Sequence, residues 1–365
     1  MKVLLLSTYE KTGGAAIAAS RLLQALRHNG VEATMLCRKN NIGKQSWTSI
    51  MERAVIWMFN GFSKKDLWAT DIALFGQDIT MTREYREADV IHLHWINQGF
   101  ISLFQIERFI KDGKKIVWTM HDAWNTMGAY HLAIQRRESL MERWTWRRKR
   151  ELYSLNKIQF VTCSRWLREE ARRSELTEQL SVKAIPNPID TTLFAPQSTK
   201  KHGRRVLFVA QNVNNPMKGM SYLDEAVAML KGNDAVELIA LGRDIPYIND
   251  VEEMVKLYNS VDAFVLPSLS ENLPNTIMEA MACGTPCVAF GVGGIPEMID
   301  HKENGYVARY KNPQDLADGI RYVLNTDNHE RLSKAAREKV LKCYGEESVA
   351  SLYKEVYYSL RAQKD

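Results

Sequence analysis

Short apolar runs alternate with segments of helical length along the whole chain. In the first half, the expected strands are Val3–Thr8, Ala33–Cys37, Val90–His94, Lys115–Met120 and Gln159–Cys163. Apolar runs of this length are typical of strands that are buried on both faces, and helices between them are typical of βα units. The stretch from Ala15 to Asn29 is one such helix, and Gly30 provides its stop. The pattern therefore predicts a parallel sheet covered by helices.

The alternation is interrupted by a stretch rich in turn-forming residues, between positions 187 and 203. It resumes with the expected strands Arg205–Ala210, Val236–Leu241, Ala263–Pro267 and Pro286–Phe290. From Glu346 to Leu360 the chain predicts an amphipathic helix, whose apolar stripe is formed by Val349, Leu352, Tyr353, Val356 and Leu360.

A chain of 365 residues exceeds what one hydrophobic core usually serves. We therefore expect two Rossmann-like α/β domains with parallel sheets. The first spans residues 1–186, a linker follows at 187–203, and the second spans 204–345. The last segment, 346–365, is expected to be a helix that crosses back to the N-terminal domain.

The composition is that of a globular protein, with 45% hydrophobic and 25% charged residues. No apolar run approaches the roughly 20 residues of a membrane-spanning helix, and the run at Met1–Ser7 is too short for a signal peptide. The five cysteines are widely spread and predict reduced thiols, not a disulfide framework. These features favour the cytoplasm.

Basic charge is concentrated in the first half of the chain. Residues 1–185 carry 29 Lys+Arg against 19 Asp+Glu, whereas residues 186–365 carry 20 against 24. This asymmetry indicates either an anionic partner or a solvated basic face. The segments Arg143–Arg150 and Ala54–Lys65 combine aromatic and basic residues, so one interpretation is peripheral contact with an anionic membrane. The other is that Trp144 and Trp146 pack into the domain. The nucleic-acid-binding signatures are absent, so no nucleic-acid partner is expected.

Polar residues follow three of the strands in the first half, where ligands bind in doubly wound sheets. Gly13 and Gly14 open the first helix, in a turn that suits either a phosphate or a plain connection. The third strand ends with His92 and His94, which alternation places on one side. We expect them to line a cleft, because no third metal ligand has suitable spacing.

The fourth strand is followed by His121 and Asp122, with aromatic residues on both sides. A histidine and a carboxylate at a strand end suit the binding and polarisation of a hydroxyl-rich ligand. A structural histidine is the alternative for His121.

The most specific pattern in the second half is a pair of carboxylates, Glu271 and Glu279. Glu271 is at the carboxyl end of a strand, where it can accept hydrogen bonds from sugar hydroxyls. The loop Asn272–Asn275 follows, and Glu279 is expected in the first turn of a helix that begins near Thr276. A first-turn carboxylate can bind ribose hydroxyls, and the helix start favours a diphosphate. Helix capping alone also explains Glu279, but it does not explain Glu271.

Two further turns of the second half have residues suited to a ligand. Lys218 lies in the stretch from Ala210 to Gly219 and is placed as a point charge for a phosphate. The turn Gly291–Glu297 contains three glycines that allow close approach of the backbone, with a carboxylate at its rim.

These residues resemble the family 4 retaining glycosyltransferases, which have the two-Rossmann GT-B fold with a deep interdomain cleft. The resemblance covers essentially the whole chain and is most specific at Glu271–Pro286 and Val292–Glu297. Further family blocks are Thr119–Asp122, Thr162–Leu167 and Pro186–Asp190. The sequence is most similar to the bacterial branch that builds colanic acid and other exopolysaccharides or lipopolysaccharides.

The resemblance implies that a sugar passes, with retention of configuration, from a nucleoside-diphosphate-sugar donor to a glycan or lipid-linked acceptor. Catalytic roles fall to His121, near the transferred sugar, and to Glu271, which holds donor-sugar hydroxyls. Glu279 is expected to bind the ribose and Lys218 to neutralise the leaving diphosphate. The other donor-binding residues implied are Gly13, Gly14, Asn272 and Leu273, and further cleft candidates are His94, Asn212, Arg243, Gly294 and Glu297.

No metal and no cofactor are expected, because the nucleotide sugar is a substrate and no Asp-x-Asp element is present. The expected location is the cytoplasm, with peripheral contact to the inner face of the membrane as one option.

The sequence departs from the family pattern at three places. Gln211 and Asn212 stand where relatives usually have an arginine, and the stretch Gly242–Asp250 runs straight into a helix where relatives have another strand. After Trp124, a cysteine-bearing insertion found in many exopolysaccharide relatives is absent. A degenerate, non-catalytic nucleotide-sugar-binding protein is therefore one alternative function. A nucleotide-sugar epimerase on a similar two-Rossmann scaffold is another. A dinucleotide dehydrogenase is disfavoured, because no Gly-x-Gly-x-x-Gly follows the first strand.

Overall fold

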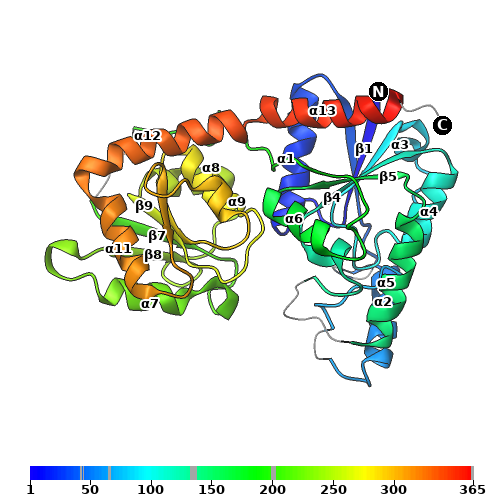
Figure 1. Cartoon of the computed structure of the whole chain (residues 1–365), viewed down its shortest axis with the longest axis horizontal. Helices are drawn as coiled ribbons and strands as arrows, with labels where there is room; N and C mark the ends of the chain where they lie inside the picture. Colours follow the sequence, from blue (N-terminus) through cyan, green and yellow to red (C-terminus); the bar gives the residue numbers. More distant parts are fainter. Residues whose placement is uncertain (42, 44, 65–66, 132–137, 199–202, 363–365) are drawn as a thin grey trace. The chain divides into compact units, whose positions relative to one another are not determined.

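The computed structural model describes residues 1–365 except 42, 44, 65–66, 132–137, 199–202 and 363–365. The chain folds as two compact units (Figure 1). One consists of Met1–Ile185 with Ala350–Asp365, and the other is Pro186–Val349. The segment expected as a linker therefore lies within the second unit, apart from residues 199–202, which fall outside the described residues.

The first unit contains a six-stranded parallel sheet with the strand order β2-β1-β3-β4-β5-β6. The strands are β1 (Lys2–Ser7), β2 (Glu32–Cys37), β3 (Val90–Leu93), β4 (Lys115–Met120), β5 (Ile158–Thr162) and β6 (Val182–Ala184). The helices around them are α1 (Gly14–His28), α2 (Trp47–Phe59), α3 (Arg83–Glu87), α4 (Leu103–Lys111), α5 (Leu140–Tyr153) and α6 (Arg165–Arg173). Strand β6 was not predicted, because its three residues are partly or fully exposed and show no apolar run.

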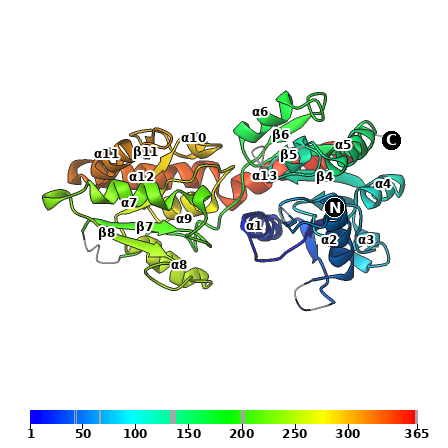
Figure 2. The same ribbon diagram turned by 90° about the horizontal axis from the view of Figure 1, so that it is seen from below.

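The second unit contains a five-stranded parallel sheet with the order β11-β10-β9-β7-β8 (Figure 2). The strands are β7 (Arg205–Val209), β8 (Glu237–Leu241), β9 (Ala263–Leu266), β10 (Cys287–Phe290) and β11 (Gly305–Ala308). The helices are α7 (Met220–Ala228), α8 (Val251–Asn259), α9 (Asn275–Ala282), α10 (Ile295–Met298), α11 (Pro313–Leu324) and α12 (Thr326–Cys343). Strand β8 lies at the edge of the sheet, and the fully described stretch between β8 and β9 contains α8 and no strand.

Each sheet is wound in two directions from one strand. In the first unit β1 pairs with β2 on one side and β3 on the other. In the second unit β7 pairs with β8 and β9 in the same way. At such a switch point the loops after the two neighbouring strands diverge to opposite faces, which leaves a crevice at their carboxyl ends. The two crevices are therefore the places to look for a ligand site.

The last helix, α13 (Glu346–Ala362), belongs to the first unit from Ala350 onward. The hydroxyl of Tyr357 lies 2.7 Å from Nδ1 of His92 on β3, and the hydroxyl of Tyr353 lies 3.0 Å from Oγ1 of Thr119 on β4. The apolar stripe differs from the prediction at one position. Leu352 is 39% exposed, whereas Tyr357 is fully buried. The buried face of the helix consists of Val349, Tyr353, Val356, Tyr357 and Leu360, and Leu352 lies at the edge of this face.

Candidate functional site

The glycine turn of the first unit lines a cavity at the β1/β3 switch point. Gly13 caps the start of α1 with φ at 89°, a backbone conformation that strains any residue with a side chain. The cavity has a volume of about 330 Å³. Its lining residues are Ser7, Tyr9, Thr12, Gly13, Gly14, Ala15, Ala16, Trp95, His121 and Asp122. The structure thus brings together Gly13, Gly14 and His121, which come from two separate strand ends.

Three histidines lie next to this cavity in a connected row. The rings of His92 and His94 are 4.3 Å apart, as expected from their alternation on β3. Nδ1 of His94 shares a hydrogen bond of 2.9 Å with Nε2 of His121. His92 is bonded instead to Tyr357 and to Oγ1 of Thr119, at 2.8 Å from its Nε2. His92 and His94 are therefore buried supports, and His121 is the member of the row that reaches the cavity.

The three histidines are neutral near pH 7. Burial lowers the pKa of His121 to about 4, and the negative charge of Asp122 offsets only part of this effect. Burial and the nearby His121 lower the pKa of His92 to about 3, and burial holds the pKa of His94 well below its ordinary value. A neutral imidazole can donate or accept a hydrogen bond at the cavity, but it brings no charge there.

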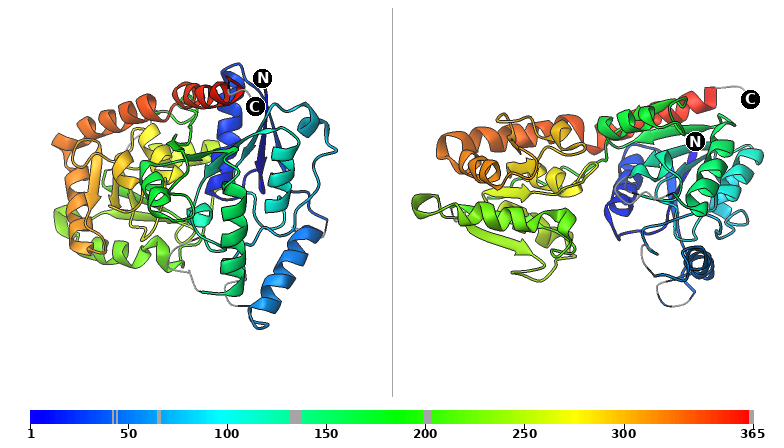
Figure 3. Two further views of the ribbon diagram at one scale, coloured as in Figure 1. Left: turned by 45° about the vertical axis from the view of Figure 1, so that its right-hand side comes forward. Right: turned by 60° about the horizontal axis from the view of Figure 1, so that its bottom comes forward.

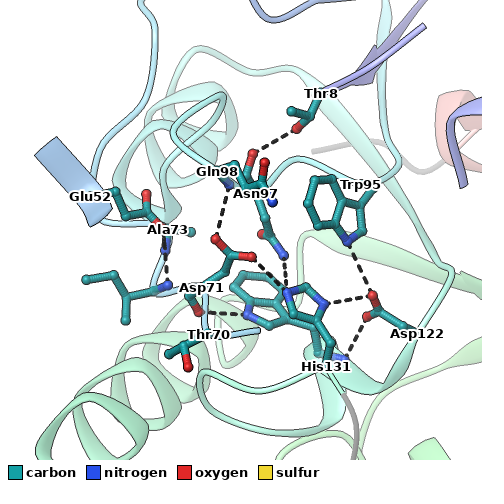
Figure 4. Close-up of polar contacts among 12 residues, drawn as sticks. Thr8, Glu52, Thr70, Asp71, Ala73, Trp95, Asn97, Gln98, Asp122 and His131 are labelled. Carbon is teal, nitrogen blue, oxygen red and sulfur yellow. Dashed lines mark hydrogen bonds and ion pairs between the residues drawn. The ribbon is translucent and has the colours of Figure 1, made fainter. Parts of the chain in front are cut away.

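Asp122 is held in place by a charged network that the sequence did not reveal (Figure 4). Oδ2 of Asp122 accepts a hydrogen bond from Nε1 of Trp95 at 3.2 Å and lies 2.7 Å from Nδ1 of His131. Nε2 of His131 lies 2.9 Å from Oδ2 of Asp71, which also pairs with Arg53 on α2. These four charged residues are far apart in the sequence and form no motif, so only the fold brings them together.

His131 is the positively charged centre of this network. Burial disfavours its charged form, but the charge of Asp122 and the hydrogen bonds to Asp122 and Asp71 outweigh burial and raise its pKa to about 10. The pKa of Asp122 lies below its ordinary value, because the charge of His131 and the hydrogen bond from Trp124 N outweigh the effect of burial. Asp122 therefore remains a carboxylate that is fixed at the rim of the cavity.

In the second unit, Lys218 and Glu271 meet at the β7/β9 switch point. Nζ of Lys218 lies 2.6 Å from Oε1 of Glu271, and the side chains of the two residues are 34% and 15% exposed. Gly219 allows the two loops to approach: its φ is 71°, and a Cβ there would lie 1.9 Å from the carbonyl oxygen of Pro267. The backbone N–H of Leu269 completes the contact by donating to Met217 O at 2.8 Å.

The third glycine-rich turn packs against the same loop. Gly293 has φ at 57°, and a Cβ there would lie 1.7 Å from the carbonyl oxygen of Glu271. The N–H of Gly294 donates to the carbonyl of Asn272 at 2.7 Å. Leu273 is buried behind this contact, and Glu297 lies in the first turn of α10. The turns after β7, β9 and β10 thus form one cluster around Glu271.

Glu279 differs from its expected position. Helix α9 begins at Asn275, one residue before Thr276, so Glu279 is its fifth residue and lies beyond the first turn. The carboxylate is buried and accepts a hydrogen bond of 2.8 Å from the hydroxyl of Tyr258 on α8. Burial and the charge of Glu279 raise the pKa of Tyr247. A buried carboxylate among tyrosines remains well suited to hydroxyl groups, but the argument from the helix start does not apply to it.

Two cleft candidates are held by contacts outside the cluster around Glu271. Arg243 forms ion pairs with Asp224 at 2.8 Å and with Asp244 at 2.9 Å in the loop after β8. Oδ1 of Asn212 accepts a hydrogen bond from the N–H of Asn214 at 3.0 Å, in an exposed turn. Among the residues that the structure describes, no three His, Cys, Asp or Glu side chains are grouped as a metal site would require.

Two family models match the chain. The model of Glycosyltransferase Family 4 matches residues 12–193, and that of the Glycosyl transferases group 1 matches residues 203–326. The chain belongs to the family 4 glycosyltransferases. The first matched region contains most of the residues that line the cavity at β1/β3, and the second contains the Lys218–Glu271 pair at β7/β9.

Curated relatives match this chain over part of their length. The chain is 30% identical over 240 residues to an uncharacterized glycosyltransferase of Methanocaldococcus jannaschii. The aligned region covers 56% of this chain and 61% of the relative. The chain spans between 30% and 61% of the length of the first curated relatives that it matches.

Solved structures share its fold over nearly the full length. Sucrose-phosphate synthase from Thermosynechococcus elongatus has a TM-score of 0.73 at 17% identity, with 99% of both chains covered. Anabaena HepE in complex with UDP-glucose has a TM-score of 0.65 at 16% identity, with 98% of this chain and all of the other covered. With its two parallel-sheet units, the chain therefore has the GT-B fold.

Proposed function

We propose that this family 4 member transfers a sugar from a nucleoside-diphosphate-sugar donor to a hydroxyl of a glycan or lipid-linked acceptor. The observation that carries the proposal is the Lys218–Glu271 pair, which places a cation and a carboxylate 2.6 Å apart at the carboxyl end of β7 and β9. A donor presents a diphosphate next to sugar hydroxyls, which are complementary to these two groups. The UDP-glucose held by HepE supports a nucleotide sugar as the donor.

In this proposal the second unit binds the donor. Glu279 accepts hydrogen bonds from the ribose, next to the hydroxyl of Tyr258. Glu271 turns from Lys218 to the sugar hydroxyls, and Lys218 turns to the diphosphate as it leaves. A positive group aimed at the developing negative charge is electrostatic stabilisation of the leaving group, which needs no metal ion.

The first unit supplies His121 and the glycine turn. The N–H groups at the start of α1 are close to Gly13 and face a cavity, so they suit a diphosphate oxygen. His121 is neutral and is oriented by His94, so it acts as a hydrogen-bonding group near the transferred sugar and not as a charged acid. We propose that configuration at the anomeric carbon is retained.

The acceptor belongs, in this proposal, to the synthesis of a bacterial exopolysaccharide or lipopolysaccharide, at the inner face of the membrane. In the part of the chain that the structure describes, no helix has the length and apolarity needed to cross a bilayer. Peripheral contact is therefore the form of membrane association that we propose.

A thermal-shift screen against nucleoside diphosphates and their sugars tests the donor. A ligand at 100 times its dissociation constant stabilises the folded state by roughly 2.7 kcal/mol, which raises the melting temperature clearly. We expect one base to stabilise the protein with its diphosphate and with its sugar nucleotide. A screen in which no nucleotide raises the melting temperature would contradict the proposal.

A non-catalytic sugar-nucleotide-binding protein is the second candidate, favoured by Gln211 and Asn212 where relatives usually have an arginine. Incubation of the stabilising donor with the enzyme separates the candidates. A transferase releases nucleoside diphosphate, slowly to water and faster once an acceptor is added. A binding protein leaves the donor intact, and an epimerase converts the donor sugar without releasing the diphosphate.

A further inference from the structure

Helix α2 buries both of its charged residues and exposes most of its large apolar residues, although Ile56 is buried against Ile72 and Met141. Ser49, Glu52 and Arg53 are buried, and Glu52 and Arg53 are the helix's only charged residues. The large apolar side chains on the other faces are between 39% and 61% exposed: Trp47, Met51, Trp57, Met58 and Phe59. A helix on the surface of a water-soluble domain normally shows the reverse arrangement. The exposed apolar face of α2 is therefore a candidate contact surface.

The buried charges fix this orientation. Oε1 of Glu52 accepts hydrogen bonds from the N–H groups of Ile72 and Ala73, at 3.2 and 3.1 Å. Arg53 pairs with Asp71 and donates to the carbonyl of Thr70 at 2.8 Å. Rotation of α2 to bury its aromatic side chains would break these contacts and leave charges without partners, which is strongly unfavourable. The buried contacts of Glu52 and Arg53 thus keep the apolar face of α2 directed outward.

The apolar surface continues beyond the end of the helix. Phe62 is 64% exposed and packs edge-to-face on Trp57, with ring centroids 4.8 Å apart. Trp68 is 53% exposed and lies over the guanidinium of Arg53 at 5.4 Å. We call the seven side chains the α2 patch: Trp47, Met51, Trp57, Met58, Phe59, Phe62 and Trp68. Exposed apolar groups that cluster in this way mark interaction sites more often than single exposed residues do.

The neighbouring helix α5 contributes less than its sequence suggests. Lys149 is fully buried and donates to the carbonyls of Met127 and Gly128 at 2.9 and 2.6 Å. Arg148 pairs with Glu107 and Glu151. The basic run of α5 is therefore partly an internal support, and Arg148 and Lys149 do not favour the membrane interpretation of this segment. Arg143 and Arg147 are exposed, on a helix that packs against α2 (Figure 3).

The charges around the patch favour a lipid surface over a protein. Between Trp47 and Trp68, the span of the patch, the acidic residues are Glu52, which is buried, and Asp66, which lies outside the described residues, while Lys64 is exposed. The exposed face offers few hydrogen-bonding groups besides the two indoles of α2, whereas protein interfaces carry about one hydrogen bond per 100–200 Å². Tryptophan at headgroup level with Phe and Met below, flanked by basic residues, matches a helix that lies in the interface of an anionic bilayer.

We propose that the α2 patch inserts into the interfacial layer of an anionic membrane. This inference rests on the proposed function, because it assigns the acceptor to that surface, and it adds which element makes the contact. Arg53 of α2 also pairs with Asp71, which contacts His131 beside Asp122 of the cavity. The anchoring helix is thereby connected by direct contacts to the cavity at the β1/β3 switch point.

Sedimentation of the full chain with vesicles tests the proposal. The variants are Met58→Ser with Phe59→Ser, and the matched control is Met229→Ser with Leu341→Ser, which changes two side chains of similar exposure in the second unit. We expect the wild type and the control to bind vesicles that contain phosphatidylglycerol, more weakly at high salt. The patch variant should bind at least about tenfold more weakly, because both lost side chains would leave the apolar layer.

Three results would overturn the proposal: no binding of the wild type to anionic vesicles at low salt, equal binding of the patch variant, or a stable dimer in solution that the patch variant abolishes. The last outcome would mean that a second copy covers the face. Circular dichroism checks that the variants fold. The thermal shift with the nucleotide is measured on the wild type and on the same variants. If the wild type binds the nucleotide but not the vesicles, or if the patch variant binds the vesicles as the wild type does, this inference fails and the proposed donor binding stands.

Discussion

His121 acts in this account through a hydrogen bond and not through a charge. Its pKa near 4 and its bond to His94 keep it neutral and oriented at the cavity. We expect His121→Ala to reduce turnover by at least about a hundredfold, the size of a typical positioned catalytic group, with an unchanged melting temperature. Because the neutral form predominates above pH 4, protonation of His121 should cause no loss of turnover near pH 6.5. The pH profiles of turnover for the wild type and for His121→Gln should therefore have the same shape in this range. Near-normal turnover of His121→Ala would assign the residue a structural role.

The two carboxylates of the second unit separate binding from turnover. Glu279 is buried beside Tyr258, whereas Glu271 is paired with Lys218. We expect Glu279→Gln to weaken nucleotide binding by about 1.5–3 kcal/mol, the usual loss of a hydrogen bond to a charged group. Glu271→Gln should lower kcat for the sugar nucleotide and leave the affinity for the nucleoside diphosphate nearly unchanged. Titration calorimetry with the diphosphate measures the first effect, and equal affinity of Glu279→Gln and wild type would refute the ribose assignment.

Among the elements, the buried strands could be predicted from sequence because apolar runs such as Lys115–Met120 have no other place in a folded domain. Strand β11 could not, since Gly305 and Tyr306 begin it and no apolar run marks it. Helix boundaries were less secure: α9 starts one residue before the expected position, which removes Glu279 from the first turn. Contacts between elements, such as those of Arg53 and His131, were beyond reach, because they depend on tertiary packing and not on spacing.

The network that joins these elements has a defined pH dependence. The pKa of His131 is about 10 in the folded protein, above the ordinary value of 6.5. A raised folded-state pKa contributes stability that is fully present below pH 6.5 and is lost as the pH rises to about 10. The free energy of unfolding of the wild type should therefore fall, relative to that of His131→Gln, by roughly 1–3 kcal/mol across this window. Urea unfolding at pH 6, 8 and 10 measures the difference, and parallel profiles would show that the network carries no net charge stabilisation.

At the scale of the whole molecule, the double alternation of strands and helices predicted two α/β units, and the GT-B fold agrees with it. The second-unit site was predictable as well, because its residues lie within short motifs after β7, β9 and β10. The first-unit site was predictable only in part: Gly13 and His121 follow strands, but Asp71 and His131 come from loops with no motif. Local sequence patterns predict which residues follow the strands. The residues that hold those side chains in place, such as Asp71 and His131, can be identified only from the folded structure.

We propose that the strand ends of the second unit bind the diphosphate of a nucleotide sugar. Titration of the stabilising nucleoside diphosphate into Lys218→Met tests it most directly, with Lys334→Met, an exposed lysine on α12, as the matched control. We expect Lys218→Met to bind the nucleoside diphosphate about 10- to 100-fold more weakly than the wild type does. The reason is that loss of a charge-assisted contact costs about 1.5–3 kcal/mol of binding free energy. The control should bind as the wild type does. Equal affinity of Lys218→Met and wild type would contradict the account.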